Sequence, residues 1–179
     1  ARDVAARQRF LREARAAGGL AHPNIVTVFD VGQAEATPYL VMELLKGGTL
    51  EDWLERDRLA ELDTGMLIEL AIQLARGLAY AHQHGVIHRD IKPANIHYDP
   101  KTNVAKMMDF GIAAIERDTD DDSGDGAGRI AGTMTHMAPE LLAGQRADAR
   151  SDLYSLGVVL YQLLSGRLPF DAQDLETLI

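Results

Sequence analysis

Leucines recur at helical spacing along one stretch of the chain, between residues 66 and 83. Intervals of three or four residues place side chains on the same face of a helix, one turn above another. The stretch therefore predicts an amphipathic helix. Gly85 should terminate it, because glycine readily adopts the left-handed conformation that follows a helix end. The apolar face of this helix carries Leu67, Leu70, Leu74, Leu78 and Ala81.

A second predicted helix begins at Ser151, whose hydroxyl is a good N-cap, and runs to about Leu164. Gly166 ends this helix and Pro169 prevents it from resuming. Apolar residues lie nearly all round its circumference, so we expect it to be buried. Residues 2–17 form a further predicted helix, which stops at a pair of glycines.

Two stretches rich in β-branched and aromatic residues predict strands, at residues 25–31 and 39–43. A break follows at residues 46–48, and Thr49 is placed to cap a short helix that begins at Leu50. The predicted order is one helix, two strands and then a mainly helical body. This order indicates an α+β fold.

The composition is that of an ordinary globular protein, with 46% hydrophobic and 25% charged residues among 179. No run approaches the roughly 18 consecutive apolar residues of a membrane span. The arginine-rich start does not resemble a signal peptide. The chain has no cysteine, which excludes disulfides and thiolate metal sites and fits a cytoplasmic protein. We expect a cytoplasmic location for this segment, while a membrane anchor outside it is left open.

The net charge of −9 argues against a nucleic-acid-binding face and against docking to anionic lipid. The charge is uneven, since residues 1–15 carry five arginines and residues 118–125 carry five aspartates. The acidic run is expected to be a solvated, mobile loop.

Three short motifs follow one another in the second half of the chain. Residues 88–95 read His-Arg-Asp-Ile-Lys-Pro-Ala-Asn, residues 109–111 read Asp-Phe-Gly, and residues 138–140 read Ala-Pro-Glu. Phosphoryl transfer needs an aspartate that accepts the proton of the substrate hydroxyl and a lysine near the phosphate. It also needs an asparagine and a second aspartate that hold magnesium. The motifs supply these groups in this order, which is the signature of protein kinases. The chain therefore resembles a protein kinase.

The resemblance covers nearly the whole chain. It points to the bacterial serine/threonine kinases of eukaryotic type, through Arg-Phe-x-x-Glu-Ala at residues 9–14 and His-Pro-Asn-Ile-Val at residues 22–26. It implies an α+β fold with a partial small lobe and hinge over residues 1–45, made of one helix and two strands. A partial, mainly α-helical large lobe is expected over residues 46–179. Both ends of the kinase fold are expected to be missing.

The resemblance also implies the reaction, which is transfer of the γ-phosphate of ATP to a serine or threonine hydroxyl of a protein substrate. Asp90 is the expected catalytic base, and Lys92 is expected to steady the transferring phosphate. Asn95 and Asp109 are expected to hold Mg²⁺, which prefers oxygen ligands and also draws them from the phosphates. ATP and Mg²⁺ are thus the implied cofactors.

Five residues are expected to face the nucleotide. Met42 resembles the gatekeeper, and backbone groups of Glu43 and Leu45 resemble the hinge that faces adenine. Ordinary core packing describes the apolar residues here equally well. His97 lies where a bulky apolar residue usually packs beneath adenine. Glu13 resembles the helix glutamate that pairs with a strand lysine on the α- and β-phosphates.

The segment between the second and third motifs resembles an activation segment. Arg89 marks the subclass of kinases in which a phosphate on this segment pairs with the arginine. Thr119 and Ser123 are the candidate hydroxyls. Alternatively, the aspartate cluster supplies some of the negative charge itself. Thr133 resembles the threonine that lies against the substrate-binding loop and the catalytic aspartate.

Three further residues have structural counterparts in the family. Asp152 resembles a buried aspartate that holds the backbone of the catalytic loop. Glu140 resembles a glutamate that pairs with an arginine of a later helix. His136 replaces the tyrosine that usually precedes Met-Ala-Pro-Glu.

The sequence before Glu13 contains no glycine-rich loop and no strand lysine, so we expect an incomplete catalytic domain. Two strands without the rest of their sheet would leave an open edge, and the helix at residues 151–164 would expose apolar surface. Two functions are compatible with this pattern. One is a segment of an active serine/threonine kinase, and the other is a catalytically weak, kinase-like module that binds partners. The sequence does not indicate an oligomeric state.

Overall fold

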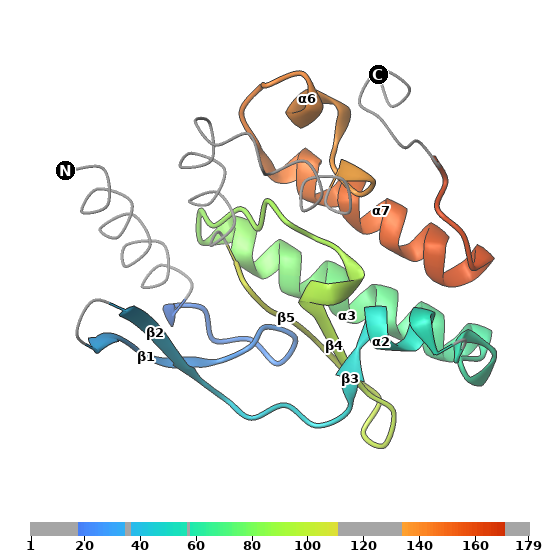
Figure 1. Ribbon diagram of the computed structural model, residues 1–179, viewed down its shortest axis with the longest axis horizontal. Coiled ribbons are helices and arrows are strands. Elements are labelled where there is room, and N and C mark those ends of the chain that lie inside the picture. Colours follow the sequence, from blue (N-terminus) through green and yellow to red (C-terminus); the bar gives the residue numbers. More distant parts are fainter. Residues whose placement is uncertain (1–17, 35–36, 57, 111–133, 171–179) are drawn as a thin grey trace.

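The computed structural model describes residues 18–34, 37–56, 58–110 and 134–170. Two small antiparallel sheets lie beside two long helices, which gives the α+β fold that the sequence predicts (Figure 1). The predicted helix at residues 2–17 and the acidic run at residues 118–125 lie outside the described residues.

The first sheet is a hairpin of β1 (Val28–Ala34) and β2 (Thr37–Met42). The predicted first strand begins three residues too early, because Ile25 and Val26 pair with another part of the chain. The N–H of Val26 donates to the carbonyl of Met107 at 2.9 Å, and both apolar side chains before the hairpin are buried. Their hydrophobicity therefore reflects burial beside the second sheet and not membership of the hairpin.

The second sheet has the order β3 (Gly48–Thr49), β4 (Ile96–Asp99) and β5 (Val104–Met107), and all neighbours are antiparallel. Successive side chains of a strand point to opposite faces. Accordingly Ile96 and Tyr98 are fully buried, while the residues between and after them are only half buried.

The short helix α2 (Leu50–Glu55) begins at Thr49, which is the predicted cap. The Thr49 hydroxyl accepts the N–H of Asp52 at 3.1 Å, and the Asp52 carboxylate accepts the N–H of Thr49 at 2.9 Å. This reciprocal arrangement is a capping box, which satisfies two backbone donors at the helix start. Trp53 of this helix packs edge-on against Tyr98, with ring centroids 5.4 Å apart.

Helix α3 (Thr64–Gln83) follows a 3₁₀ turn, η1 (Leu59–Glu61), and confirms the predicted amphipathic helix. It starts two residues earlier than predicted, because the carboxylate of Asp63 caps it by accepting the N–H of Met66 at 2.8 Å. Gly85 follows the helix end with φ of 74°, as expected of a glycine there. The buried positions include the predicted Leu70, Leu74, Leu78 and Ala81.

Helix α7 (Ala149–Ser165) ends at Gly166, as predicted, but Ser151 is not its N-cap. The cap is Asp148, whose carboxylate accepts the N–H of Arg150 at 2.7 Å. The Ser151 hydroxyl instead accepts the N–H of Asp148 at 3.3 Å and completes a capping box from inside the helix. The sequence offers two good caps three residues apart, and this reciprocal bond places the start at the first of them.

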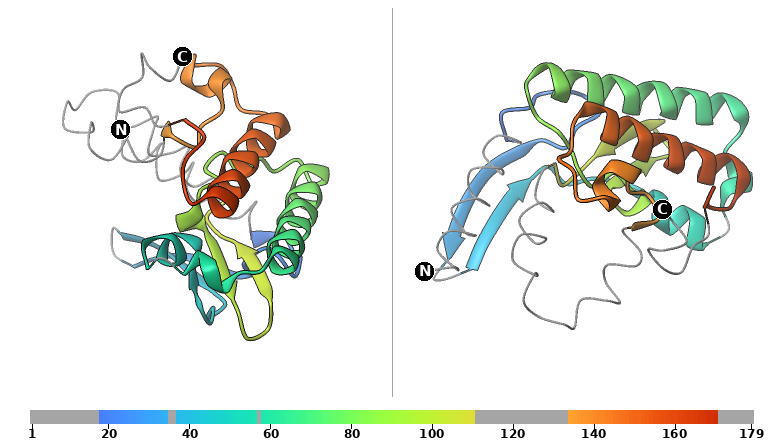
Figure 2. Two further views of the ribbon diagram at one scale, coloured as in Figure 1. Left: turned by 90° about the vertical axis from the view of Figure 1, so that its right-hand side faces the viewer. Right: turned by 90° about the horizontal axis from the view of Figure 1, so that it is seen from above.

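The prediction that this helix is buried on all sides is wrong. One stripe of α7 packs inward, while Leu153 is 54% exposed and Leu164 is 68% exposed. Figures 1 and 2 show α3 alongside α7, and this neighbour covers only one side of the helix. The exposed apolar side chains therefore form a stripe on the side of α7 that faces away from α3.

The core lies between α2, α3, the second sheet and α7. In Figure 2 the β1–β2 hairpin projects away from the two long helices. Two short elements complete the described fold, the 3₁₀ turn η2 (Pro93–Asn95) and the helix α6 (Pro139–Leu142). Among the described residues, no helix combines the length and the hydrophobicity needed to cross a membrane.

A prediction concerns Gly47, which precedes β3 with φ of 107°. A Cβ at this position would lie 2.2 Å from the carbonyl oxygen of Tyr98, so backbone atoms would have to move. Gly47→Ala should therefore lower the free energy of unfolding by about 2 kcal/mol or more, measured by urea denaturation.

The matched control is Gly157→Ala, because Gly157 lies inside α7 with open space around its Cα. Alanine there should raise the free energy of unfolding by up to about 1 kcal/mol, since it favours the helix. A Gly47→Ala protein as stable as the original would contradict the close backbone approach.

Candidate active site

The loop formed by residues 88–95 connects α3 to β4, and one residue in this loop and one after β5 have a strained backbone. Arg89 has φ of 71°, in the left-handed region that residues with a side chain seldom adopt. Asp109, which follows β5, has φ of 60°. Backbone strain of this kind persists only where surrounding interactions fix the chain, and such positions cluster at functional sites. The interactions that fix this loop can be identified.

The carboxylate of Asp152 anchors the loop from the first turn of α7. Its two oxygens accept the backbone N–H groups of His88 and Arg89, each at 2.8 Å. The carboxylate is also 2.8 Å from Nε2 of His82, and Asp152 is 1% exposed. A buried carboxylate is tolerated when hydrogen-bond donors surround it, as they do here. The prediction that Asp152 holds the backbone of this loop is confirmed.

The sequence reasoning missed His82, which lies in the last turn of α3. One signal was available, because His82 follows Leu78 by four residues and so continues the buried face of the helix. A polar residue on an apolar face needs a partner, and here the partner is the Asp152 carboxylate.

Three of the predicted catalytic residues meet within hydrogen-bond distance. The side-chain amide of Asn95 donates to the Asp90 carboxylate at 2.9 Å and to the Asp90 carbonyl at 2.8 Å. The ammonium of Lys92 lies 2.9 Å from the same carboxylate oxygen. Asp90 is 9% exposed and Asn95 is 7% exposed, so this cluster is a largely desolvated polar group whose members hold one another in place.

Asp109 lies beside this cluster, and neighbouring groups offset the negative charge of its carboxylate less fully than that of Asp90. A backbone hydrogen bond of 2.9 Å from Met108 to the carbonyl of Asn95 joins the end of β5 to the loop. Burial raises the pKa of Asp109 above its ordinary value, and the negative charge of Asp90 adds to this, while His88 and Lys92 oppose it. The site therefore has an excess of negative charge that a cation would relieve.

The ring of His88 packs on the neighbouring Phe110, with centroids 4.4 Å apart. His88 is fully buried, and burial lowers its pKa, so the ring is neutral at pH 7. Its Nδ1 lies 3.4 Å from the N–H of Asp90, and its Nε2 has no hydrogen-bond partner among the described residues. The ring therefore acts as a packing element between the loop and the Asp-Phe-Gly motif.

The donor set fits Mg²⁺. Asn95 and Asp109 offer an amide oxygen and a carboxylate, the hard oxygen ligands that Mg²⁺ prefers. The part of the chain that the structure describes contains no cluster of three histidine, cysteine or acidic residues able to form an all-protein metal site. Mg²⁺ at this position would therefore take its remaining ligands from water and from phosphate oxygens.

The predicted hinge is tied to β5 through the side chain of Glu43. Its carboxylate accepts the ammonium of Lys106 at 2.6 Å and the N–H of Thr27 at 2.7 Å. Burial by itself raises the pKa of Glu43, but these hydrogen bonds hold it below the ordinary value. Met42 is 38% exposed, and Leu45 is half buried beyond the hinge. The carboxylate is thus ionised at neutral pH and fixes the backbone of Glu43.

His97 lies in the middle of β4, opposite Thr49 of β3 and Lys106 of β5. Burial lowers its pKa, while Asp52 and Asp99 raise it by a smaller amount. The ring is therefore neutral at pH 7 and half buried. Four other predicted residues, Glu13, Thr119, Ser123 and Thr133, lie outside the described residues.

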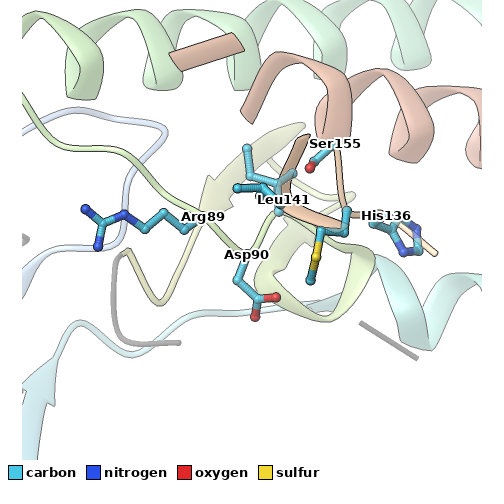
Figure 3. Close-up of a pocket in the computed structure, with 7 residues that line it drawn as sticks. Arg89, Asp90, His136, Leu141 and Ser155 are labelled. Carbon is cyan, nitrogen blue, oxygen red and sulfur yellow. The ribbon is translucent and has the colours of Figure 1, made fainter. Parts of the chain in front are cut away.

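A small pocket adjoins Asp90 on the side of α6 and α7 (Figure 3). In Figure 3 the guanidinium of Arg89 points away from the other labelled side chains. The carboxylate of Glu140 accepts the Ser151 hydroxyl at 2.6 Å and so ties α6 to the start of α7. The pocket is lined by Arg89, Asp90, Ile91, His136, Met137, Leu141 and Ser155.

Substitutions of two aspartates at the start of α7 should lower the free energy of unfolding by different amounts. Asp152→Ala removes the acceptor for two backbone N–H groups, so it should lower the free energy of unfolding by about 3 kcal/mol or more. Asp148→Ala removes an exposed cap and an exposed ion pair with Arg150, and should cost about 1 kcal/mol. Urea denaturation measures both values, and equal losses would contradict the anchoring role of Asp152.

The raised pKa of Asp109 predicts a stability change with a defined pH dependence. Because the folded state favours the protonated carboxyl group, ionisation of Asp109 opposes folding once the pH exceeds its ordinary value of 3.8. Asp109→Asn should therefore raise the melting temperature at pH 7, and this gain should disappear below pH 3.8. A lower melting temperature of the variant at pH 7 would show that the carboxylate is compensated.

Comparison with known proteins agrees with this geometry. The family model described as Protein kinase domain matches residues 1–178. The serine/threonine-protein kinase PknB of Mycolicibacterium smegmatis is 45% identical over 174 residues, which are 95% of this chain and 27% of the relative. Pkn3 of Myxococcus xanthus is 44% identical over 171 residues, which are 93% of this chain and 31% of the relative.

PknJ of Mycobacterium tuberculosis, also named a serine/threonine-protein kinase, is 45% identical over 174 residues. These residues are 96% of this chain and 28% of that relative. The chain thus spans roughly three tenths of the length of the curated relatives that it matches. The three motifs, the geometry around Asp90 and these similarities lead to one conclusion: the chain belongs to the protein kinase family, and its similar relatives are bacterial serine/threonine kinases.

Proposed function

We propose that the chain is the catalytic part of a protein serine/threonine kinase that transfers the γ-phosphate of ATP to a hydroxyl of a protein substrate. The observation that carries this proposal is that Lys92 and Asn95 each lie 2.9 Å from the same carboxylate oxygen of Asp90. Asp109 lies close enough for the charges of Asp90 and Lys92 to act on its carboxyl group. A cluster of this kind supplies a base, a positive charge and oxygen ligands at one point, which phosphoryl transfer requires.

In this mechanism Asp90 accepts the proton of the substrate hydroxyl. The amide of Asn95 and the ammonium of Lys92 hold the carboxylate in place, so it needs little reorganisation when the substrate binds. Lys92 also brings positive charge to the transferring phosphate. Asn95 and Asp109 would hold Mg²⁺, which when bound would supply positive charge to offset that of the phosphate oxygens.

The remaining assignments are part of the proposal. Met42, the backbone groups of Glu43 and Leu45, and His97 would line the adenine site, and the tie between Glu43 and Lys106 supports the hinge. Glu13 would pair with a strand lysine near the phosphates. We place the boundary between the small and large lobes after residue 45. ATP as a substrate also favours a cytoplasmic location for this part of the protein.

The activation segment is assigned in the same way. Arg89 would pair with a phosphate on Thr119 or Ser123, or with the aspartates between them, and Thr133 would support the substrate-binding loop.

The test is phosphate transfer from Mg·ATP to serine- and threonine-containing peptides by the complete gene product. Asp90→Asn should lower kcat by about 10²-fold to 10⁴-fold, because the catalytic base is lost while the shape of the side chain is kept. The affinity for ATP should change less than about threefold, since Asp90 is proposed to act on the hydroxyl and not on the nucleotide.

Asp99→Asn is the matched control. Asp99 is at the turn between β4 and β5, where its carboxylate accepts the N–H of Lys101 at 3.0 Å and the Thr102 hydroxyl at 2.9 Å. Its replacement should leave kcat within about twofold. Transfer by the Asp90→Asn protein at more than a tenth of the original rate would contradict the role of Asp90. Absence of transfer by the unaltered protein would favour the partner-binding module.

A further inference from the structure

His136 occupies an unusual place next to the proposed base. It shortly precedes α6, is 7% exposed, and lines the same pocket as Asp90. Figure 3 shows its ring on the opposite side of the pocket from Arg89. A buried histidine in such a position needs partners for both ring nitrogens.

Both nitrogens have such partners. Nε2 lies 2.9 Å from Oε1 of Gln162 on α7, and Nδ1 lies 3.1 Å from Oγ1 of Thr135. An amide oxygen only accepts, so Nε2 carries the proton and Nδ1 accepts the hydroxyl hydrogen of Thr135. The neutral ring therefore satisfies both partners and ties the segment of residues 134–138 to α7.

The charged groups around His136 come from two directions. From the catalytic loop, Asp90 and Lys92 act on the ring with opposite signs. Arg89 also lines the pocket. On α6 the carboxylate of Glu140 is occupied by the Ser151 hydroxyl, and the contact from α7 is the uncharged amide of Gln162.

We propose that His136 is a positioning residue for the transfer reaction: its neutral ring holds the segment beside Asp90 in place, and a proton on the ring weakens both that segment and the base. This inference rests on the proposed kinase function. A positive charge in the pocket would repel Lys92 and stabilise the ionised form of Asp90, which makes Asp90 a poorer proton acceptor. It would also reverse the hydrogen bond between Nδ1 and Thr135.

The direction of the pH effect follows from the surroundings of the ring. Burial lowers the pKa of His136 from its ordinary value of 6.5, and Lys92 lowers it further, while the bond to Gln162 and the charge of Asp90 oppose this. His136 is therefore neutral at pH 7 and takes up a proton only below pH 6.5. The value of kcat/KM should therefore fall in that pH range by more than the titration of other groups in the protein would cause.

The experiment measures kcat and KM for a peptide substrate from pH 5.5 to pH 8 on the complete gene product, with three variants. Gln162→Leu removes the tie, so the peptide KM should rise about threefold to tenfold at every pH while the KM for ATP is unchanged. Gln162→Glu puts a carboxylate beside the ring, which raises the pKa of His136 and should move the acidic loss of kcat/KM to higher pH.

His136→Gln provides the rescue, because a glutamine amide can donate to Gln162 but does not titrate. It should keep at least about half of the activity at pH 8 and lose less of it at pH 5.5 than the unaltered protein. Gln145→Leu is the control, since Gln145 is an exposed glutamine after α6 and its replacement should change neither KM nor the pH profile.

The outcomes separate this inference from the function on which it rests. If the unaltered protein transfers phosphate but the Gln162→Glu variant has the same dependence of kcat/KM on pH, the pH role of His136 is overturned. If Gln162→Leu leaves the peptide KM unchanged, the positioning role is overturned. Each variant is informative alone, so poor folding of one leaves the others decisive. If the unaltered protein transfers no phosphate, the kinase function itself fails and the inference fails with it.

Discussion

The carboxylate of Asp152 is the group on which the geometry of the site depends. It accepts two consecutive backbone N–H groups from a loop 63 and 64 residues earlier in the chain. The second of these residues, Arg89, has φ of 71°, so the backbone changes direction directly after the two anchored amides. A buried charge without donors would be strongly unfavourable, so the folded chain has no comparable alternative for this loop. Asp90 is placed as a consequence.

Strand β5 has a similar role for the other half of the site. The amide oxygen of Gln73 accepts the side chain of Asn24 at 2.8 Å and the N–H of Ala105 at 2.9 Å, in a buried polar network between α3 and the strand. One residue further along, Lys106 binds the carboxylate of Glu43 at the hinge. The strand then ends at the Asp-Phe-Gly motif. The proposed hinge and the proposed metal ligand Asp109 are therefore both attached to one short element, and a shift of β5 would move both.

Local patterns in the sequence account for much of this structure. Leucine spacing predicts α3, Thr49 predicts the start of α2, and the three motifs predict the residues that meet around Asp90. What local patterns cannot supply is the partner of a buried polar residue. His82 finds Asp152 at a separation of 70 residues, and Gln73 finds Ala105 at a separation of 32. Both lie among apolar neighbours on a helix, where the 3.6-residue period predicts burial but does not specify the partner.

The errors in element boundaries have the same origin. Ile25 and Val26 have the composition of a strand, yet they pair with β5 and not within the hairpin, because contacts far along the chain decide where a β-branched residue is buried. Ser151 is a good cap by composition. It lies inside the helix because the Asp148 carboxylate is available one turn earlier. In each case two local conformations fit the sequence about equally well, and tertiary contacts determine which one forms.

The two acidic residues of the site are compensated to different degrees, and this difference bears on function. The carboxylate of Asp90 contacts an amide and an ammonium group, so the fold itself fixes its position. Asp109 has a strained backbone and a raised pKa, and both make the ionised folded state less stable. A fold selected only for stability would have little reason to keep such a group. Binding of a cation would compensate the carboxylate of Asp109 and would restore the stability given up there. The position of Asp90 is thus set by folding alone, whereas the charge of Asp109 would be compensated only by a cation.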